Sequence, residues 1–281
     1  MPLNFLIRAA GIAGVIAMST RLSALAINSL YVAFVLGHFL TSFIYSKKRL
    51  LAPASGPDFL VLIACGLTAF FRFPDIVLYF GVHYALTEVY WINKMHPQWS
   101  YLTPHRFLLN AFGYLFMLRH EKAIAAVPGY FWAVGLVGAL VYFFYGIHKR
   151  RVSARNLVDT FLFEAAAMLP IVLSIFFEIK FWNLLVYHTF IWIFIPAVKK
   201  PPMKWHEAFS YWLLTSLLTT GILLLTPLGG GYLNVPLKKL DDAVVFWGYM
   251  HITSSFMLSS YNPEWVTRLF RWQRKTAFSN G

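Results

Sequence analysis

The sequence predicts an all-α protein built as a polytopic membrane helical bundle. Its composition is 59% hydrophobic and only 12% charged, against about 25% charged residues in an ordinary soluble domain. Apolar runs close to the roughly 20 residues that span a bilayer recur along the whole chain. Because so many of these runs are present, we expect about eight to ten transmembrane helices.

Ten apolar segments form the predicted helices. They cover residues 3–20, 23–46, 57–72, 74–92, 102–118, 125–146, 155–177, 180–198, 207–228 and 240–261. Pro57 and Pro74 begin the third and fourth segments, and the Leu-Gly-Gly-Gly run at 228–231 ends the ninth. The third segment is short, and the long side chain of Arg72 extends it to the membrane interface. Arg8 resembles the charged region of a cleavable signal peptide. Because nine further apolar segments follow, we expect the first segment to be retained as a helix.

The distribution of Lys and Arg predicts the orientation of the bundle. Most of the 24 Lys and Arg residues fall on one side of the ten-helix arrangement. The clusters on that side are 47–49, 149–151, 199–200 and 268–275. Loops rich in Lys and Arg face the cytoplasm, so both termini are predicted to be cytoplasmic.

Two regions follow from this topology. Residues 1–261 form the predicted transmembrane domain, and 262–281 form a cytoplasmic tail in which aromatic and basic residues alternate. Such a tail is typical of an interfacial helix on anionic lipid. The net charge of +13 does not indicate a nucleic-acid partner, because the basic residues lie in short loops between apolar segments. We expect a multi-pass protein of a bacterial inner membrane.

Four histidines lie singly within four of the apolar segments: His38, His83, His188 and His251. An ionisable ring inside hydrocarbon costs free energy unless it faces a partner, and imidazole is the commonest metal ligand. All four belong to segments that run from the outside to the cytoplasm. Three lie near the bilayer centre, and His38 lies deeper unless a helix tilt brings it level. This shared direction and depth predict one metal site that holds all four rings.

Polar neighbours give each ring a second interpretation. Taken singly, each histidine is well explained by a hydrogen bond to a hydroxyl or backbone carbonyl on a neighbouring helix. Thr41, Thr87 and Ser254 each follow one of the histidines by about one helical turn. If a metal is bound, these hydroxyls are expected to orient the rings.

Two carboxylates also lie in apolar sequence, and they are the catalytic candidates. Glu88 lies on the segment that carries His83, and Glu164 lies in the run VDTFLFEAAAMLP. Acidic residues inside a membrane mark functional sites by default. Either carboxylate is suited to orient a histidine, to ligate the ion or to relay protons.

The choice of metal depends on the surroundings of the site. All-imidazole sites suit Zn, Cu, Fe and Ni, and the single cysteine, Cys65, excludes a cysteine-based site. An apolar lining, supplied by 27 Phe, 15 Tyr and 10 Trp, favours a lipid-soluble substrate and dioxygen. We therefore predict non-haem Fe(II) in an oxygenase that acts on an apolar small molecule. Two alternatives stay open: a b-type haem or quinone electron carrier, and a proton-coupled transporter.

The layout of the four histidines resembles the bacteriorhodopsin-related Brp/Blh family, integral-membrane dioxygenases that cleave beta-carotene to retinal. The elements that carry the resemblance are GHFLTSFIYS, YFGVHYALTE, NLLVYHTFIWIF and FWGYMHITSSF. The third element of that family has two histidines four residues apart, where this chain has His188 and Trp192. The resemblance implies one iron bound within the membrane by His38, His83 and His188, with His251 completing the set, and a carotenoid as the substrate.

Overall fold

The computed structural model describes residues 3–50, 56–72, 75–95, 97–149, 154–194 and 203–258. Within these residues the chain is helical with short turns and has no strand, so the all-α prediction is confirmed. A helix is found in each of the ten predicted segments. These helices are α1 (Leu3–Arg21), α2 (Ala24–Leu50), α3 (Gly56–Arg72), α4 (Ile76–Met95), α5 (Thr103–Met117), α6 (Gly129–Lys149), α7 (Ala154–Phe176), α8 (Phe181–Ile193), α10 (Trp205–Leu225) and α11 (Leu237–Leu258). The predicted tail, 262–281, lies outside the described residues.

Prolines set several helix ends, and they explain where the predicted boundaries differ. The helix predicted from residue 125 begins at Gly129, because the residue before Pro128 is disfavoured in the helical conformation. The same effect ends α10 at Leu225, with Thr226 extended before Pro227. Three short 3-10 helices were not predicted. They are η2 (Pro97–Leu102), between α4 and α5, and η3 (Pro227–Gly229) and η4 (Tyr232–Asn234), both between α10 and α11.

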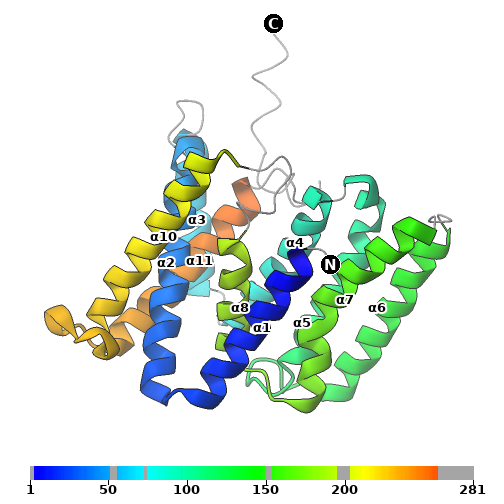
Figure 1. Ribbon diagram of the computed structural model, residues 1–281, viewed down its shortest axis with the longest axis horizontal. Helices are drawn as coiled ribbons and strands as arrows, with labels where there is room; N and C mark the ends of the chain where they lie inside the picture. The colour runs from blue at the N-terminus through cyan, green and yellow to red at the C-terminus, as the bar shows by residue number, and fades with distance from the viewer. Residues whose placement is uncertain are drawn as a thin grey trace, which may run out of the picture.

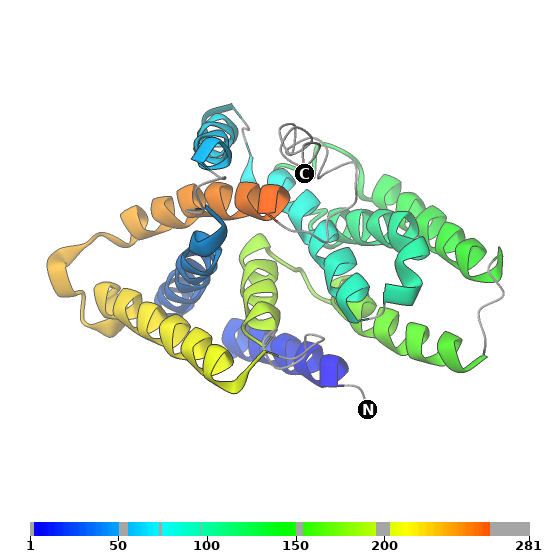
Figure 2. The same cartoon turned by 90° about the horizontal axis from the view of Figure 1, so that it is seen from above.

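The helices pack around a central element, α8. In Figure 2, viewed from above, α8 lies between α2, α11, α4 and α1. Helix α2 packs against α8, α10 and α11, while α11 also packs against α3 and α4. On the other side, α5 packs against α4, α6 and α7. The segments that carry the four histidines are therefore neighbours in the middle of the protein (Figure 1).

Three helices of the described part are long and apolar enough to cross a membrane. They are the Ala24–Tyr45 portion of α2, and all of α6 and α10. Shorter apolar helices cover Leu60–Arg72, Glu164–Phe176 and Phe181–Ile193. Helices α6 and α10 lie on the outside of the bundle with apolar side chains facing outward, such as Val134 (68% exposed) and Leu217 (61% exposed). Large apolar outer faces of this kind mark a membrane or partner contact rather than an aqueous surface.

A glycine fixes the contact between α2 and α10. A Cβ atom at Gly37 would lie 3.1 Å from both the backbone nitrogen and the Cα of Thr219. Without a side chain, the backbones approach closely, and the next residue along α2 is His38. The close crossing therefore helps to determine where that ring lies.

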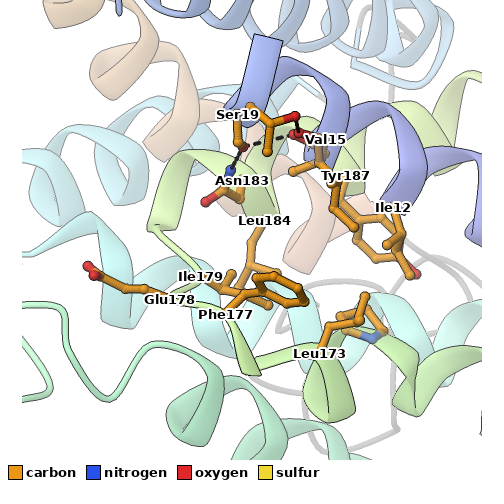
Figure 3. Close-up of a pocket in the computed structure, with 13 residues that line it drawn as sticks. Ile12, Val15, Ser19, Leu173, Phe177, Glu178, Ile179, Asn183, Leu184 and Tyr187 are labelled. Atoms are coloured by element: carbon orange, nitrogen blue, oxygen red, sulfur yellow. Dashed lines mark hydrogen bonds between the residues drawn. The ribbon is translucent and has the colours of Figure 1, made fainter. Parts of the chain in front are cut away.

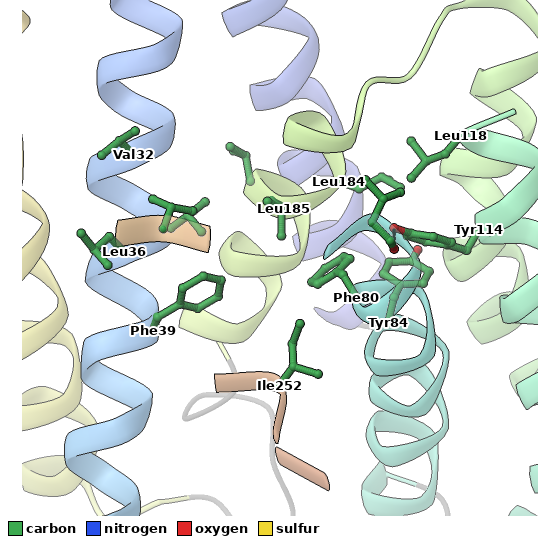
Figure 4. Close-up of a cluster of buried hydrophobic side chains, with 14 of the residues drawn as sticks. Val32, Leu36, Phe39, Phe80, Tyr84, Tyr114, Leu118, Leu184, Leu185 and Ile252 are labelled. Carbon is green, nitrogen blue, oxygen red and sulfur yellow. Dashed lines mark hydrogen bonds between the residues drawn. The ribbon is translucent and has the colours of Figure 1, made fainter. Parts of the chain in front are cut away.

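A cluster of buried apolar side chains joins the four histidine-bearing helices. Figure 4 shows Phe39 of α2 extending toward α8, with Val32 and Leu36 on the same helix in the same buried cluster. The α8 side chains Leu184 and Leu185 lie between α2 and α4, and each is less than 5% exposed. Burial of side chains such as these contributes about 1.5–3 kcal/mol each. The core of the protein thus surrounds the region where the histidines lie.

Candidate metal centre

The four histidines reach one place from four different helices. His38 on α2 and His251 on α11 lie equally far from the starts of their helices, and so do His83 on α4 and His188 on α8. Helices α2, α8 and α11 run in the same general direction (Figure 1). His251 lies further along its helix than predicted, because α11 begins at Leu237 rather than at residue 240.

The rings are in mutual contact. His83 Nε2 and His188 Nε2 are 3.3 Å apart. The ring centroids of His83 and His251 are 5.3 Å apart, and those of His38 and His251 are 5.1 Å apart. One nitrogen each of His38, His188 and His251 lies within 4.8 Å of the other two. The structure brings the four rings together, as their shared direction predicts, while metal binding by them stays a prediction.

The spacing of the nitrogens suits a metal ion. Metal–imidazole bonds are about 2.0–2.1 Å long, which places two nitrogens of a tetrahedral site about 3.3 Å apart. The His83–His188 distance already has that value. One nitrogen each of His38 and His251 lies within 4.8 Å of a nitrogen of His188 and of the other. The 3.3 Å contact also requires that one ring donates and the other accepts, so at least one of the two imidazoles is neutral.

Aromatic side chains enclose the four rings. Phe39 stacks on His251 with centroids 4.8 Å apart and an interplanar angle of 22°. Phe80 meets His188 edge-on at 5.2 Å, and Phe256 lies 6.3 Å from the ring of His83. The four histidines are between 2% and 6% exposed. The site is therefore dry, and electrostatic interactions inside it are strong.

Several imidazole nitrogens have no hydrogen-bond partner among the described residues. Both ring nitrogens of His38 and Nδ1 of His251 are buried without one. Thr41, expected to orient His38, donates its hydroxyl to the carbonyl oxygen of Gly37 at 2.8 Å instead. A threonine inside a helix readily bonds the carbonyl one turn back, and the role of this hydroxyl as an acceptor for a metal-bound His38 stays a prediction. Unpartnered buried polar groups are costly, and a bound cation would take up one nitrogen of each ring.

Glu88 lies in a buried ion pair rather than beside an imidazole. Arg8 of α1 donates from Nη1 to Glu88 Oε1 at 3.1 Å, and from Nη2 to Oε2. The same Nη1 donates to the hydroxyl of Tyr187 at 3.2 Å. Arg8 is fully buried and Glu88 is 3% exposed. Because Tyr187 precedes His188, this network holds α8 against α1 and α4 next to the histidines.

Glu164 forms a second buried ion pair. Its Oε1 accepts from Nε of Arg106 on α5, and Arg106 Nη1 also donates to the carbonyl oxygen of Trp99 at 3.1 Å. Within the described part of the chain, neither Glu88 nor Glu164 bonds one of the four imidazoles. Both carboxylates were singled out from the sequence, but their arginine partners were not.

A signal for these arginines was present in the sequence. Arg8 and Arg106 each lie inside an apolar stretch, LNFLIRAAGI and HRFLLNAF. A lone basic residue in an apolar stretch needs a partner as much as a lone acid does. Matching the two buried acids to the two buried bases would have predicted ion pairs, although not which acid pairs with which base.

Comparison with known proteins adds no relative. No protein-family model matches the chain, and neither the curated proteins nor the solved structures contain a significant match. The chemical interpretation of the site therefore rests on its own residues.

Proposed function

We propose that the protein is a membrane-bound non-haem iron oxygenase that acts on an apolar substrate dissolved in the bilayer. The observation that carries the proposal is the meeting of four imidazoles from α2, α4, α8 and α11 in a dry interior. Imidazoles are neutral metal ligands that suit iron. A hydrolytic site would need water at the reacting centre, whereas an aromatic-walled interior suits dioxygen and hydrocarbon.

The proposal includes a multi-pass topology. The ten helices cross a bacterial inner membrane with both termini in the cytoplasm, and the tail 262–281 lies on the cytoplasmic surface. Three helices with the length and composition of membrane spans support this. The short helix α8 lies in the interior of the bundle, where protein rather than lipid surrounds it.

Each residue of the site has a role. His38, His83, His188 and His251 hold the iron and leave coordination positions free. Ferrous iron with such open positions activates dioxygen, and that is the chemistry the metal supplies when it is bound. The neighbouring phenylalanines exclude water and contact the apolar substrate.

The two carboxylates are proposed to act at a distance from the metal. Glu88 holds Arg8, which in turn holds the Tyr187 hydroxyl. This makes Glu88 a positioning residue for α8 and for the adjacent His188. Glu164 positions Arg106 between α5 and α7 in the same way. Because each carboxylate pairs with an arginine rather than with an imidazole, neither is proposed as a ligand of the iron.

The packing of the rings favours non-haem iron over a b-type haem. Axial imidazoles of a haem lie on opposite faces of a flat macrocycle, and the plane between them must be free. Here the rings contact one another, with the His83 and His188 centroids 5.0 Å apart. Phe39 and Phe80 then fill the adjacent space. A macrocycle would require these rings and side chains to separate.

The aromatic side chains around the four histidines indicate the class of the substrate. The proposed substrate is a carotenoid, another isoprenoid or an acyl chain, because the walls of the site supply hydrocarbon contacts and few polar groups. The resemblance to the Brp/Blh family favours a carotenoid. The choice of a carotenoid within this class is part of the proposal and depends on the histidine pattern alone.

Nitric oxide tests the proposal without a known substrate, because it binds ferrous iron where dioxygen would bind. We expect the purified protein, loaded anaerobically with Fe(II), to give the electron paramagnetic resonance signal of a non-haem iron nitrosyl. His188→Ala should abolish the signal. The control His206→Ala, at an exposed position of α10, should retain it. Iron-loaded protein that gives no such signal, or a signal unchanged in His188→Ala, would overturn the proposal.

A further inference from the structure

A cavity lies between α1, α7 and α8, on the far side of α8 from α11. Its volume is about 230 Å3. Residues 12–20 of α1 form one wall, residues 170–179 at the end of α7 form the second, and Asn183, Leu184 and Tyr187 of α8 form the third (Figure 3). The stretch of α1 from residue 12 to residue 20 is about 12 Å long at the helical rise. The cavity is therefore elongated along α1.

The lining is mostly apolar. Ile12, Val15 and Leu173 present only hydrocarbon to the space (Figure 3). At the end of α1, Ser19 donates its hydroxyl to the carbonyl oxygen of Val15 at 2.8 Å and accepts from Asn183 Nδ2 at 3.1 Å. The other polar lining residues are Thr20, Glu178 and Tyr187. This lining suits an occupant that is hydrocarbon along most of its length, and the Ser19–Asn183 pair offers a place for a polar group.

The rim of the cavity faces an apolar outer surface. Phe177 is 60% exposed and Ile16 is 41% exposed, and both line the cavity. The neighbouring residues Ile175 and Phe176 are 60% and 74% exposed. In a bilayer this surface contacts lipid rather than water. An apolar rim of this kind suits a ligand that enters from the lipid.

Tyr187 forms the end of the cavity that is nearest to the histidines. Arg8 holds its hydroxyl at 3.2 Å, so the position of the ring is fixed. Tyr187 precedes His188, and Leu184, which also lines the cavity, lies one helical turn before His188. An occupant that reaches Tyr187 is thus separated from the candidate metal centre by the width of α8.

We propose that this cavity binds one acyl or prenyl chain of a lipid-soluble molecule, with the polar end of that molecule near Ser19 and Asn183. The volume of about 230 Å3 is below the range of about 300–1,000 Å3 usual for drug-sized ligands, which suits a single chain rather than a bulky ring system. Binding of the chain needs none of the four histidines.

Photo-crosslinking in membranes tests the chain-binding site. The probe is a 16-carbon fatty acid with a diazirine in its chain, palmitic acid is the competitor, and labelled peptides are mapped by mass spectrometry. We expect saturable labelling of peptides from residues 12–20, 170–179 and 183–187. Leu173→Trp fills the cavity and should lower this labelling on the order of tenfold, since displacing two methylene groups from the site suffices for that change.

Two further variants make the result specific. Val172→Trp places the same side chain at the adjacent outer position, which is 48% exposed, and should leave the labelling unchanged. His188→Ala should also leave it unchanged, even where it abolishes the iron nitrosyl signal, so that failure of the metal site and failure of the cavity are told apart. Labelling that palmitic acid does not compete, or that Leu173→Trp does not lower, would overturn the proposal.

Discussion

Replacing His38 with leucine should stabilise the metal-free protein and destabilise the metal-loaded protein. Both ring nitrogens of His38 are buried without a hydrogen-bond partner among the described residues, and such groups cost about 1–3 kcal/mol each. In metal-free protein, leucine removes that cost. In metal-loaded protein, the same change removes one of four ligands, whose joint binding energy is about 10–16 kcal/mol in structural zinc sites. Thermal unfolding in detergent, with chelator and with added Fe(II), measures both effects.

The sign of the change is the decisive feature of this experiment. His206→Leu, at an exposed position, should shift the unfolding temperature equally with and without metal. A ligand that binds only the native state raises stability by mass action, so wild type should gain stability from Fe(II) and His38→Leu should gain much less. If His38→Leu changes stability by the same amount under both conditions, His38 is not a ligand.

Replacing Glu88 with leucine should destabilise the protein by about 3–5 kcal/mol, because it leaves the buried guanidinium of Arg8 without its counter-ion. Arg8 is fully buried, and its hydrogen bond to the neutral hydroxyl of Tyr187 does not replace a negative charge. The double variant Arg8→Met/Glu88→Leu removes both charges and should recover most of the loss. Chemical denaturation in detergent, followed by tryptophan fluorescence, compares the three proteins.

A matched acidic control is available on α10. Glu207→Leu changes an exposed carboxylate and should alter stability by less than about 0.5 kcal/mol, as is usual at surface positions. If the double variant is as unstable as Glu88→Leu alone, the loss does not come from an uncompensated charge. The assignment of Glu88 as the partner of Arg8 would then be wrong.

The sequence was sufficient for the features that depend on one segment at a time. Apolar runs of near-spanning length predicted every long helix of the described part, since hydrophobic burial and helical length are local properties. The meeting of the histidines was also predictable, because alternation of the segments gives His38, His83, His188 and His251 a common direction. Errors at helix ends, such as the later start of α6 after Pro128, were confined to a few residues.

The contacts between particular side chains of neighbouring helices could not be predicted. The pairing of Arg8 with Glu88 requires α1 to lie against α8 and α4, and no local pattern specifies that arrangement. The hydroxyl of Thr41 donates to the carbonyl of its own helix. The cavity beside Tyr187 likewise arises from the packing of three helices rather than from a motif.

Metal analysis of the purified protein tests the central claim most directly. Elemental analysis and an optical spectrum are recorded for wild type, for each of the four histidine-to-alanine variants and for His206→Ala. The account predicts close to one equivalent of iron without a Soret band in wild type and His206→Ala, and a large loss of iron in each of the four variants. Wild-type protein with only trace transition metal, or a metal content unchanged by all four substitutions, would contradict it.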